Sequence, residues 1–444
     1  MTDNLLNFLD DINKKALKHG ATECDSIVID DATTQVGVRV GKLEECEYSR
    51  GKSFGIRVFV GKKHAIVSSS DFSLENTDNI INKAIQMATN SLEDPLLSLA
   101  EEGLYNGNID LDLFDSSEIT TKQMQEKALE CENAALQVKG IVNSSGAEVS
   151  QSKTYIALAT SKGFAKSYKA STFSISTAAV AGSENGMETD YDYHTTRYLS
   201  DLKDAKIIGI NAANNAIQKL NPKKIATTEA QVIYPARFAA RLLGEFASCI
   251  NGASIARKSS FLLDMMEKQI FSSDINIFDD PLMVRGQRSR IFDSEGLATQ
   301  KLHVVENGVL KTWIMDLRSA KQLGLKSTAS ASRGIASNPS PSTSNFYLQN
   351  GKATLEEMIK NTTKGLIVTS LFGGGVNGLT GDYSQGASGL WVENGEVQYP
   401  VSEITLASNL KDIFISMIPA NDLEFKAGTN SPSLMIPKMT IAGS

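Results

Sequence analysis

The chain has 444 residues, which is enough for roughly two or three domains. Hydrophobic residues make up 41% and charged residues 21%, an ordinary globular balance that can bury a sizeable core. The formal net charge is −7, whereas a protein that grips phosphate backbones usually presents a basic face. The composition therefore argues against direct contact with nucleic acid.

The sequence shows neither a secretory signal nor a membrane-spanning segment. The N-terminal sequence MTDNLLNFLDDINKKALKHG lacks the basic start and the uninterrupted apolar run of a secretory signal. No stretch reaches the roughly 18 apolar residues that a membrane span needs. The four cysteines, Cys24, Cys46, Cys131 and Cys249, form no CxxC pair, which is typical of a reducing compartment. We therefore expect a cytoplasmic protein without membrane contact.

Apolar spacing predicts two similar rounds of elements in the first half of the chain. The predicted elements are, in chain order, an amphipathic helix at 4–19, strands within 24–70, a helix at 77–90, a helix at 121–138, strands within 150–187 and a helix at 205–220. Similar triplets, Ala84-Ile85-Gln86 and Ala216-Ile217-Gln218, close the two rounds. We interpret them as an internal duplication of a β-meander plus helix. Chance similarity of two amphipathic helices is the alternative.

The second half of the chain is predicted to be rich in strands. It begins with the strand AQVIY and a helix from Pro235 to about Ile250, since proline suits the first helical turn. The Asn307-Gly308 dipeptide between LHVVE and VLKTW predicts a type I′ hairpin. Residues 327–344 are rich in Ser, Asn and Pro, as a long loop is, and residues 355–362 have a helical pattern.

Helices and strands are segregated instead of alternating strictly, which predicts an α+β fold. We expect two domains. The first, 1–220, is an α+β domain of two meander-plus-helix blocks, and the second, 225–444, is β-rich. The sequence Asn-Pro-Lys-Lys at 221–224 is typical of a linker between them.

A glycine-rich run within 371–410 is the first candidate for function. Its glycines are Gly373, Gly374, Gly375, Gly378, Gly381, Gly386 and Gly389. Glycine bares the backbone N–H and C=O groups, so the run could form a strand edge that pairs with an extended peptide. A phosphate cradle is a weaker alternative, because no GK[ST] follows. A hairpin rich in tight turns inside a barrel is the plain structural alternative.

The helix after Pro235 is the second candidate. Phe238, Leu242, Phe246 and Ile250 recur every four residues, so one stripe faces a core. Glu245 stands beside that stripe and Cys249 follows four residues later. The two side chains could share a face and bind a metal, although a solvated glutamate and a buried free cysteine explain them as well.

Four segments together resemble the TldD/PmbA family of metallopeptidase-related proteins, and the resemblance covers nearly the whole chain. They are YSRGKSFGIRVFVGKKHAIVSSSD (48–71), RKSSFLLD (257–264), DSEGLATQ (293–300) and TGDYSQGASGLWVENGEVQYPVSEITLASNLKDIF (380–414). Members of that family have been described as modulators of DNA gyrase and as peptidases that mature a microcin precursor.

The resemblance also implies where the family's zinc motif would fall. The TldD-type member carries His-Glu-x-x-x-His on a helix just before the Arg-Lys segment, and a cysteine near the C-terminus, a donor set that suits a catalytic zinc. Spacing from Arg257-Lys258 places the motif on Gly244, Glu245 and Cys249, so the glutamate persists and both histidines are replaced. No cysteine follows Cys249. The four histidines are His19, His64, His194 and His303, and none lies on this helix.

We therefore expect neither catalytic residues nor a metal site of the family's type in this chain, which matches the PmbA-type subunit, also called TldE. The resemblance implies a heterodimer with a TldD-type subunit, or a homodimer, with zinc held by the TldD-type partner and unfolded peptide as substrate. The glycine run then becomes a substrate-binding edge formed by Gly373, Gly374, Gly375, Gly378, Gly381 and Asp382.

Two other functions stay open from the sequence. One is a self-sufficient peptidase in which Glu245 and Cys249 contribute ligands, although two protein ligands are few for a tight zinc site. The other is a non-enzymatic protein that modulates DNA gyrase or its peptide inhibitors. Acidic charge argues against contact through DNA but not against contact with a protein.

Overall fold

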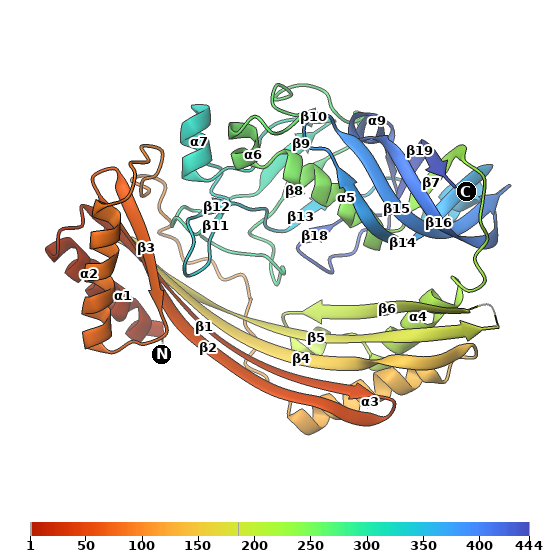
Figure 1. The fold of residues 1–444 in the computed structure, drawn as a ribbon, viewed down its shortest axis with the longest axis horizontal. Helices are drawn as coiled ribbons and strands as arrows, with labels where there is room; N and C mark the ends of the chain where they lie inside the picture. Colours follow the sequence, from red (N-terminus) through yellow and green to blue (C-terminus); the bar gives the residue numbers. More distant parts are fainter. Residues whose placement is uncertain (1, 185, 444) are drawn as a thin grey trace.

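The computed structural model describes residues 2–184 and 186–443, and its first half builds one six-stranded antiparallel sheet. The strand order is β3-β2-β1-β4-β5-β6. The strands are β1 (Glu23–Arg39), β2 (Lys42–Val60), β3 (Lys63–Ser69), β4 (Ile141–Thr160), β5 (Ala165–Ser183) and β6 (Gly186–Thr196). Figure 1 shows them as a long curved layer with the C-terminal half lying over one side.

The sheet is the centre of two equivalent blocks, each made of a helix, three strands and a further helix. The helices are α1 (Thr2–Lys18), α2 (Leu74–Thr89), α3 (Thr121–Leu136) and α4 (Ala205–Ile217), with a short 3-10 helix η1 (Leu199–Asp201) before α4. The blocks join through β1 and β4, which pair antiparallel from Asp25 opposite Thr160 to Val38 opposite Ala147. The predicted meander-plus-helix duplication is therefore present.

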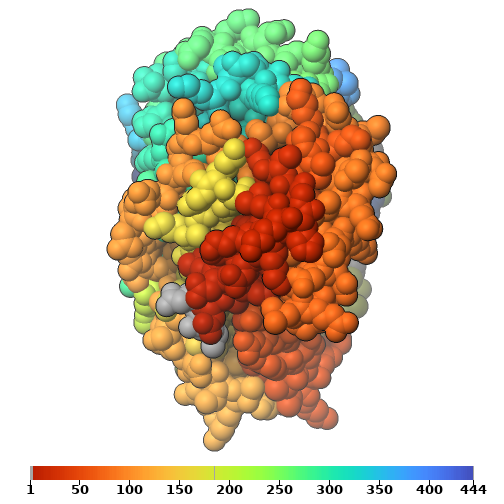
Figure 2. Space-filling view, turned by 90° about the vertical axis from the view of Figure 1, so that its left-hand side faces the viewer, coloured from red at the N-terminus to blue at the C-terminus, as the bar shows by residue number. Residues whose placement is uncertain are grey.

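Each pair of helices covers its own part of the sheet. Helices α1 and α2 lie side by side over one end of the molecule (Figure 2), and Lys15 of α1 donates to Asp78 of α2 at 2.7 Å. Leu9 and Ile12 of α1 pack there with Phe54 of β2 in one buried cluster. Helices α3 and α4 pack over the other end of the sheet.

The second half closes a small barrel. Strand β7 (Thr228–Tyr234) pairs with β14 (Lys364–Val376) and with β19 (Leu434–Ala442). Strands β15 (Asp382–Glu393) and β16 (Glu396–Asn409) follow β14, and β16 also pairs with β19, which completes the ring.

Short elements surround the barrel. The other strands are β8 (Ile277–Asp279), β9 (Leu302–Glu306), β10 (Val309–Leu310), β11 (Ala331–Ser332), β12 (Ser340–Pro341), β13 (Phe346–Leu348), β17 (Ile418–Pro419) and β18 (Thr429–Asn430). The helices are α5 (Ala236–Cys249), α6 (Gly252–Ala256), α7 (Leu317–Leu323), α8 (Leu355–Lys360) and α9 (Leu410–Ser416). Helix α5 packs Leu242 and Phe246 into the largest buried cluster of the described residues, beside barrel residues such as Leu366.

The predicted α+β fold is confirmed, and the structure also tests the predicted turn at Asn307-Gly308 and the predicted loop at 327–344. Asn307 and Gly308 both have positive φ, 49° and 79°, as a type I′ turn requires. The stretch 327–344 is not an uninterrupted loop, because β11 and β12 pair within it. The boundaries 1–220 and 225–444 stay a prediction. Among the described residues, no helix is both long and apolar enough to cross a membrane.

A buried ionic network joins the two halves. Asp25 of β1 accepts from Arg57 Nη2 at 2.5 Å and from Arg333 Nη1 at 2.7 Å, and all three side chains are nearly inaccessible to solvent. Two more carboxyl groups are buried nearby. Burial raises the pKa of Asp293 to about 6, and burial together with the Asp293 charge raises the pKa of Glu295 well above its usual value.

The raised pKa of Glu295 predicts an unusual pH dependence of stability. Folded Glu295 keeps its proton to a higher pH than the unfolded chain, whose glutamates titrate near a pKa of about 4.3. The folded protein then binds more protons than the unfolded chain, and the free energy of unfolding falls as pH rises above that value. Glu295→Gln should remove up to about 1.4 kcal/mol per pH unit of this slope.

Urea unfolding of both proteins at about pH 5 and pH 8 measures the difference. The variant should gain relative stability at the higher pH. Glu118→Gln is the matched control, since Glu118 is 80% exposed beside Lys153 and should leave the slope unchanged. Parallel pH curves for the wild type and Glu295→Gln would contradict the assignment of a neutral Glu295.

Candidate functional site

Helix α5 presents the second group of predicted residues. Pro235 is its N-cap, one residue earlier than the predicted helical position, and the helix runs from Ala236 to Cys249. Leu242, Phe246 and Ile250 are buried as predicted, and Phe238 packs against the same core while partly exposed.

The spacing of Glu245 and Cys249 does place them on neighbouring turns of one face. Burial, and next the Glu245 charge, raises the pKa of the Cys249 thiol to about 12. Cys249 is 5% exposed, whereas Glu245 is half-buried. Gly244 has no side chain, and a Cβ added there would meet nothing within 4 Å. The helix therefore offers a neutral thiol at Cys249, a carboxylate at Glu245 and no side chain at Gly244.

Helix α5 acts electrostatically on Tyr383 in the glycine-rich hairpin of β14 and β15. Burial raises the pKa of Tyr383 on β15, and the charges of Arg241 and Glu245 act on it from α5 in opposite directions. The Tyr383 hydroxyl lies 3.3 Å from that of Tyr234, at the end of β7. This pair of buried tyrosines was missed as a candidate, although Tyr234 ends the predicted strand AQVIY and Tyr383 lies in the TGDYSQG segment.

Two of the predicted glycines, Gly373 and Gly374, form a bulge in β14. The register with β15 shifts between Phe372 and Gly375, and Gly373 and Gly374 within it have φ of 54° and 67°. The side-chain amide of Gln385 donates to the carbonyls of Phe372 and Gly373, which pins the bulge. Positive φ explains why glycine is needed at these two positions.

The other predicted residues lie in the turn that follows. The carbonyl of Gly378 accepts from Phe261 N at 2.8 Å, and Gly381 has φ of 83°. The Asp382 carboxylate accepts from Thr380 at 2.6 Å and from Asn409 at 3.1 Å, and these bonds lower its pKa. Asp382 is thus engaged in holding the turn, and its role in binding substrate stays a prediction.

One edge of β14 is open beyond its first residues. Strand β14 pairs with β7 only from Gly365 to Ile367, because β7 ends at Tyr234. In the part of the chain that the structure describes, Ser370–Val376 pair with β15 alone. Residues 372–375 are exposed. The backbone groups of this edge that Gln385 does not bind could receive an added strand.

Comparison with known proteins places this geometry in a family. Three family models match the chain: PmbA/TldA metallopeptidase domain 1 at residues 24–88, the central domain at 114–220 and the C-terminal domain at 227–443. Metalloprotease PmbA of Escherichia coli O157:H7 is 35% identical over 431 residues, which are 96% of this chain and 94% of that protein. The chain belongs to the PmbA/TldD metallopeptidase family.

The relatives also distinguish the two types within the family. A metalloprotease PmbA homolog of Haemophilus influenzae is 36% identical over 92% of this chain and 90% of its own length. A metalloprotease TldD homolog of Buchnera aphidicola is 26% identical over 59% of this chain and 58% of its own length. The chain is therefore a PmbA-type member.

Solved structures share the fold over the whole length. A candidate modulator of DNA gyrase from Bacteroides thetaiotaomicron has a TM-score of 0.92 and 25% identity, with 100% of both chains covered. TldE from Thermococcus kodakarensis has a TM-score of 0.86 and 21% identity, with 98% of this chain and 100% of the other covered.

The donors on α5 of this PmbA-type chain do not fit the zinc that the family implies. Gly244 has no side chain, and a metal binds the thiolate of a cysteine, which burial of Cys249 disfavours. Of the three positions at which the family resemblance places the zinc motif, position 245 keeps the expected residue, Glu245. Within residues 2–184 and 186–443, no three His, Cys, Asp or Glu side chains are grouped so that they could hold a metal ion.

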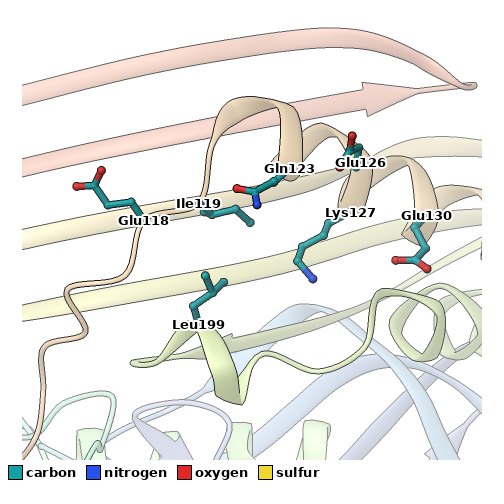
Figure 3. A pocket seen from close by; sticks show the side chains of 7 residues that line it. All are labelled: Glu118, Ile119, Gln123, Glu126, Lys127, Glu130 and Leu199. Carbon is teal, nitrogen blue, oxygen red and sulfur yellow. The ribbon is translucent and has the colours of Figure 1, made fainter.

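A hollow lined by three glutamates lies away from this site in the PmbA-type chain. A cavity of about 470 Å³ lies between α3 and η1, and Figure 3 shows Lys127 extending from α3 into this space, with Glu126 and Glu130 on the same helix. Its described lining includes none of the predicted site residues. We assign it no function.

Two neighbouring glycines of β14 provide a test of the bulge. Gly374→Ala should lower the free energy of unfolding by about 1–3 kcal/mol, because Gly374 has positive φ and a Cβ there would overlap the carbonyl of Ser384. Gly375→Ala is the matched control, since a Cβ at Gly375 meets nothing within 4 Å. Chemical unfolding measures both. Equal stabilities of the two variants would show that the bulge is placed wrongly.

Proposed function

We propose that this chain is the peptide-holding, non-catalytic subunit of a two-component metallopeptidase, and that a TldD-type chain supplies the zinc. The observation that carries the proposal is the composition of α5, which keeps Glu245 but has Gly244 and Cys249 at the positions where the family resemblance expects histidine. The rest of the fold is that of the family.

The open edge of β14 supports the peptide-holding role. An extended peptide that adds to a strand edge gains main-chain hydrogen bonds whatever its sequence, which suits unfolded substrates. The exposed Phe372, with 51% of its surface accessible, lies on this edge. Gly373 and Gly375 leave the backbone beside it uncovered.

Reconstitution with a TldD-type chain tests whether this chain holds the peptide while the other chain supplies the zinc. The isolated chain should not cleave an unfolded peptide such as reduced, alkylated casein fragments, whereas an equimolar mixture with a TldD-type chain should cleave them at a rate that the TldD-type chain alone does not reach. The controls are a partner whose motif histidines are replaced by alanine and the isolated chain in excess zinc. Cleavage by the isolated chain would contradict the proposal.

The peptide edge is tested by blocking it. Gly375→Val adds bulk where the structure has open space, so the fold should persist while the added methyl groups crowd the side chains of an incoming strand. We expect peptide affinity of the two-chain assembly, measured by fluorescence anisotropy, to fall at least about tenfold, or about 1.4 kcal/mol. Gly51→Val is the matched control, since Gly51 also lies exposed in a strand with nothing within 4 Å of an added Cβ. Equal loss in both variants, or none in Gly375→Val, would exclude this edge.

Binding to DNA gyrase or its peptide inhibitors is the second candidate function. It is motivated by the Bacteroides thetaiotaomicron structure, which is described as a candidate modulator of DNA gyrase. Affinity capture with the tagged chain from its host separates the two. Recovery of gyrase without any TldD-type chain would favour the second candidate, and recovery of a TldD-type chain favours the first.

A further inference from the structure

A hollow beside helix α5 carries a positive charge. It has a volume of about 290 Å³, and it is lined by Gly244 and Ser248 of α5, by Pro341 of β12 and by Thr429 of β18. Of the described residues that line it, Arg288 is the charged one, and none is acidic. The chain as a whole has a formal net charge of −7, so a hollow lined by a cation alone differs from the average surface.

Two neighbours hold Arg288 in place. Its backbone N–H donates to the side chain of Asn345 at 2.9 Å, and Asn345 is 1% exposed. Its side chain lies directly over Gly428, since a Cβ built there would be 2.1 Å from the Arg288 Nε and 2.7 Å from its Cζ. The guanidinium end of Arg288 therefore lies beside Thr429, the residue after Gly428, which lines the hollow.

The glycine at position 428 is explained by this contact. Gly428 does not have a positive φ, so its backbone conformation is open to any residue. A side chain there would instead occupy the space of the Arg288 Nε and Cδ. The sequence thus leaves room for the arginine at this one point, which fixes the cation before a ligand arrives.

Several donors of the hollow are free to bind a ligand. The exposed guanidinium of Arg288 has neither a hydrogen-bond acceptor nor an acidic partner among the described residues. The side-chain hydroxyls of Thr343 and Thr429, which also line the hollow, likewise bond to no described residue. A cation held in place loses little side-chain entropy when it pairs, so an anion gains more of the interaction.

We propose that this hollow binds a carboxylate of an extended peptide. The forked donors of the Arg288 guanidinium match the two oxygens of a carboxylate, and the hydroxyls of Thr343 and Thr429 donate to the same group. Neighbouring apolar atoms of the peptide pack against Ala247 and Pro341. The volume exceeds the roughly 150 Å³ that accommodates benzene, so a whole terminal residue fits.

The inference rests on the peptide-holding function proposed above, and it names the part of the peptide that is held. The edge of β14 would bind main chain without regard to sequence, whereas a carboxylate site fixes one point of the peptide. That carboxylate is either the C-terminus or an acidic side chain. This chain alone lines the hollow, so binding can be measured without zinc, a partner chain or cleavage.

Fluorescence anisotropy of the isolated chain with three dye-labelled peptides tests the proposal. Gly-Ser-Gly-Ser-Val with a free C-terminus carries its carboxylate at the end, and the C-terminal amide of Gly-Ser-Gly-Ser-Glu carries it on a side chain. The amide of the valine peptide carries none. At least one of the two carboxylate peptides should bind at least about tenfold more tightly than the neutral amide, and the tighter of the two identifies the source.

Two variants examine the role of Arg288 in this binding. Arg288→Met should reduce the affinity for the carboxylate peptide to that for the neutral amide. Gly428→Ala should also weaken binding, because the added Cβ displaces the arginine, and it should cause no further loss in the Arg288→Met background. Arg39→Met is the matched control, since the Arg39 side chain is 52% exposed and lies outside the hollow.

The proposal is overturned if neither carboxylate peptide binds more tightly than the neutral amide, or if Arg288→Met binds them as the wild type does. The peptide comparison needs no variant, so it decides the matter even if a variant fails to fold. Cleavage by the reconstituted pair without carboxylate binding here would sink this site alone. Carboxylate binding without any gain in cleavage would sink the subunit function and leave the site.

Discussion

The end of β7 determines the arrangement around the candidate site. Pro235 follows Tyr234 directly, and because proline has no N–H it cannot continue a strand ladder; it caps α5 instead. The barrel partner β14 continues beyond Ile367, where β7 no longer accompanies it. One backbone turn therefore leaves a strand edge exposed and begins the helix whose Arg241 and Glu245 charges act on Tyr383.

The chemistry available at that place fits recognition better than hydrolysis. An edge with exposed glycines can bind main chain without regard to sequence. Helix α5 offers Glu245 as a carboxylate and Cys249 as a neutral thiol, which is a poor donor set for zinc. In a family defined by metallopeptidases, this combination is what we propose for a subunit that holds the substrate while a related chain holds the metal.

Local chemistry made much of this structure predictable. The Asn307-Gly308 turn, the stripe on α5 and the duplicated meanders follow from propensities that act over a few residues. The pairing of Tyr234 with Tyr383 and the ionic network of Asp25 with Arg333 join residues far apart in the chain, and no periodicity reveals such contacts. The glycine run was identified from the sequence, but its local roles were not. The register shift between β14 and β15 shows that Gly373 and Gly374 form a bulge, and the hydrogen bond from Thr380 shows that Asp382 holds a turn.

The proposed non-catalytic role depends most on whether this chain can bind zinc through α5. The direct measurement is the zinc content of the isolated chain after equilibration with the metal and gel filtration, for the wild type and for Glu245→Gln and Cys249→Ser. We expect far less than one zinc per chain in all three proteins. About one tightly held zinc in the wild type that either substitution removes would contradict the account.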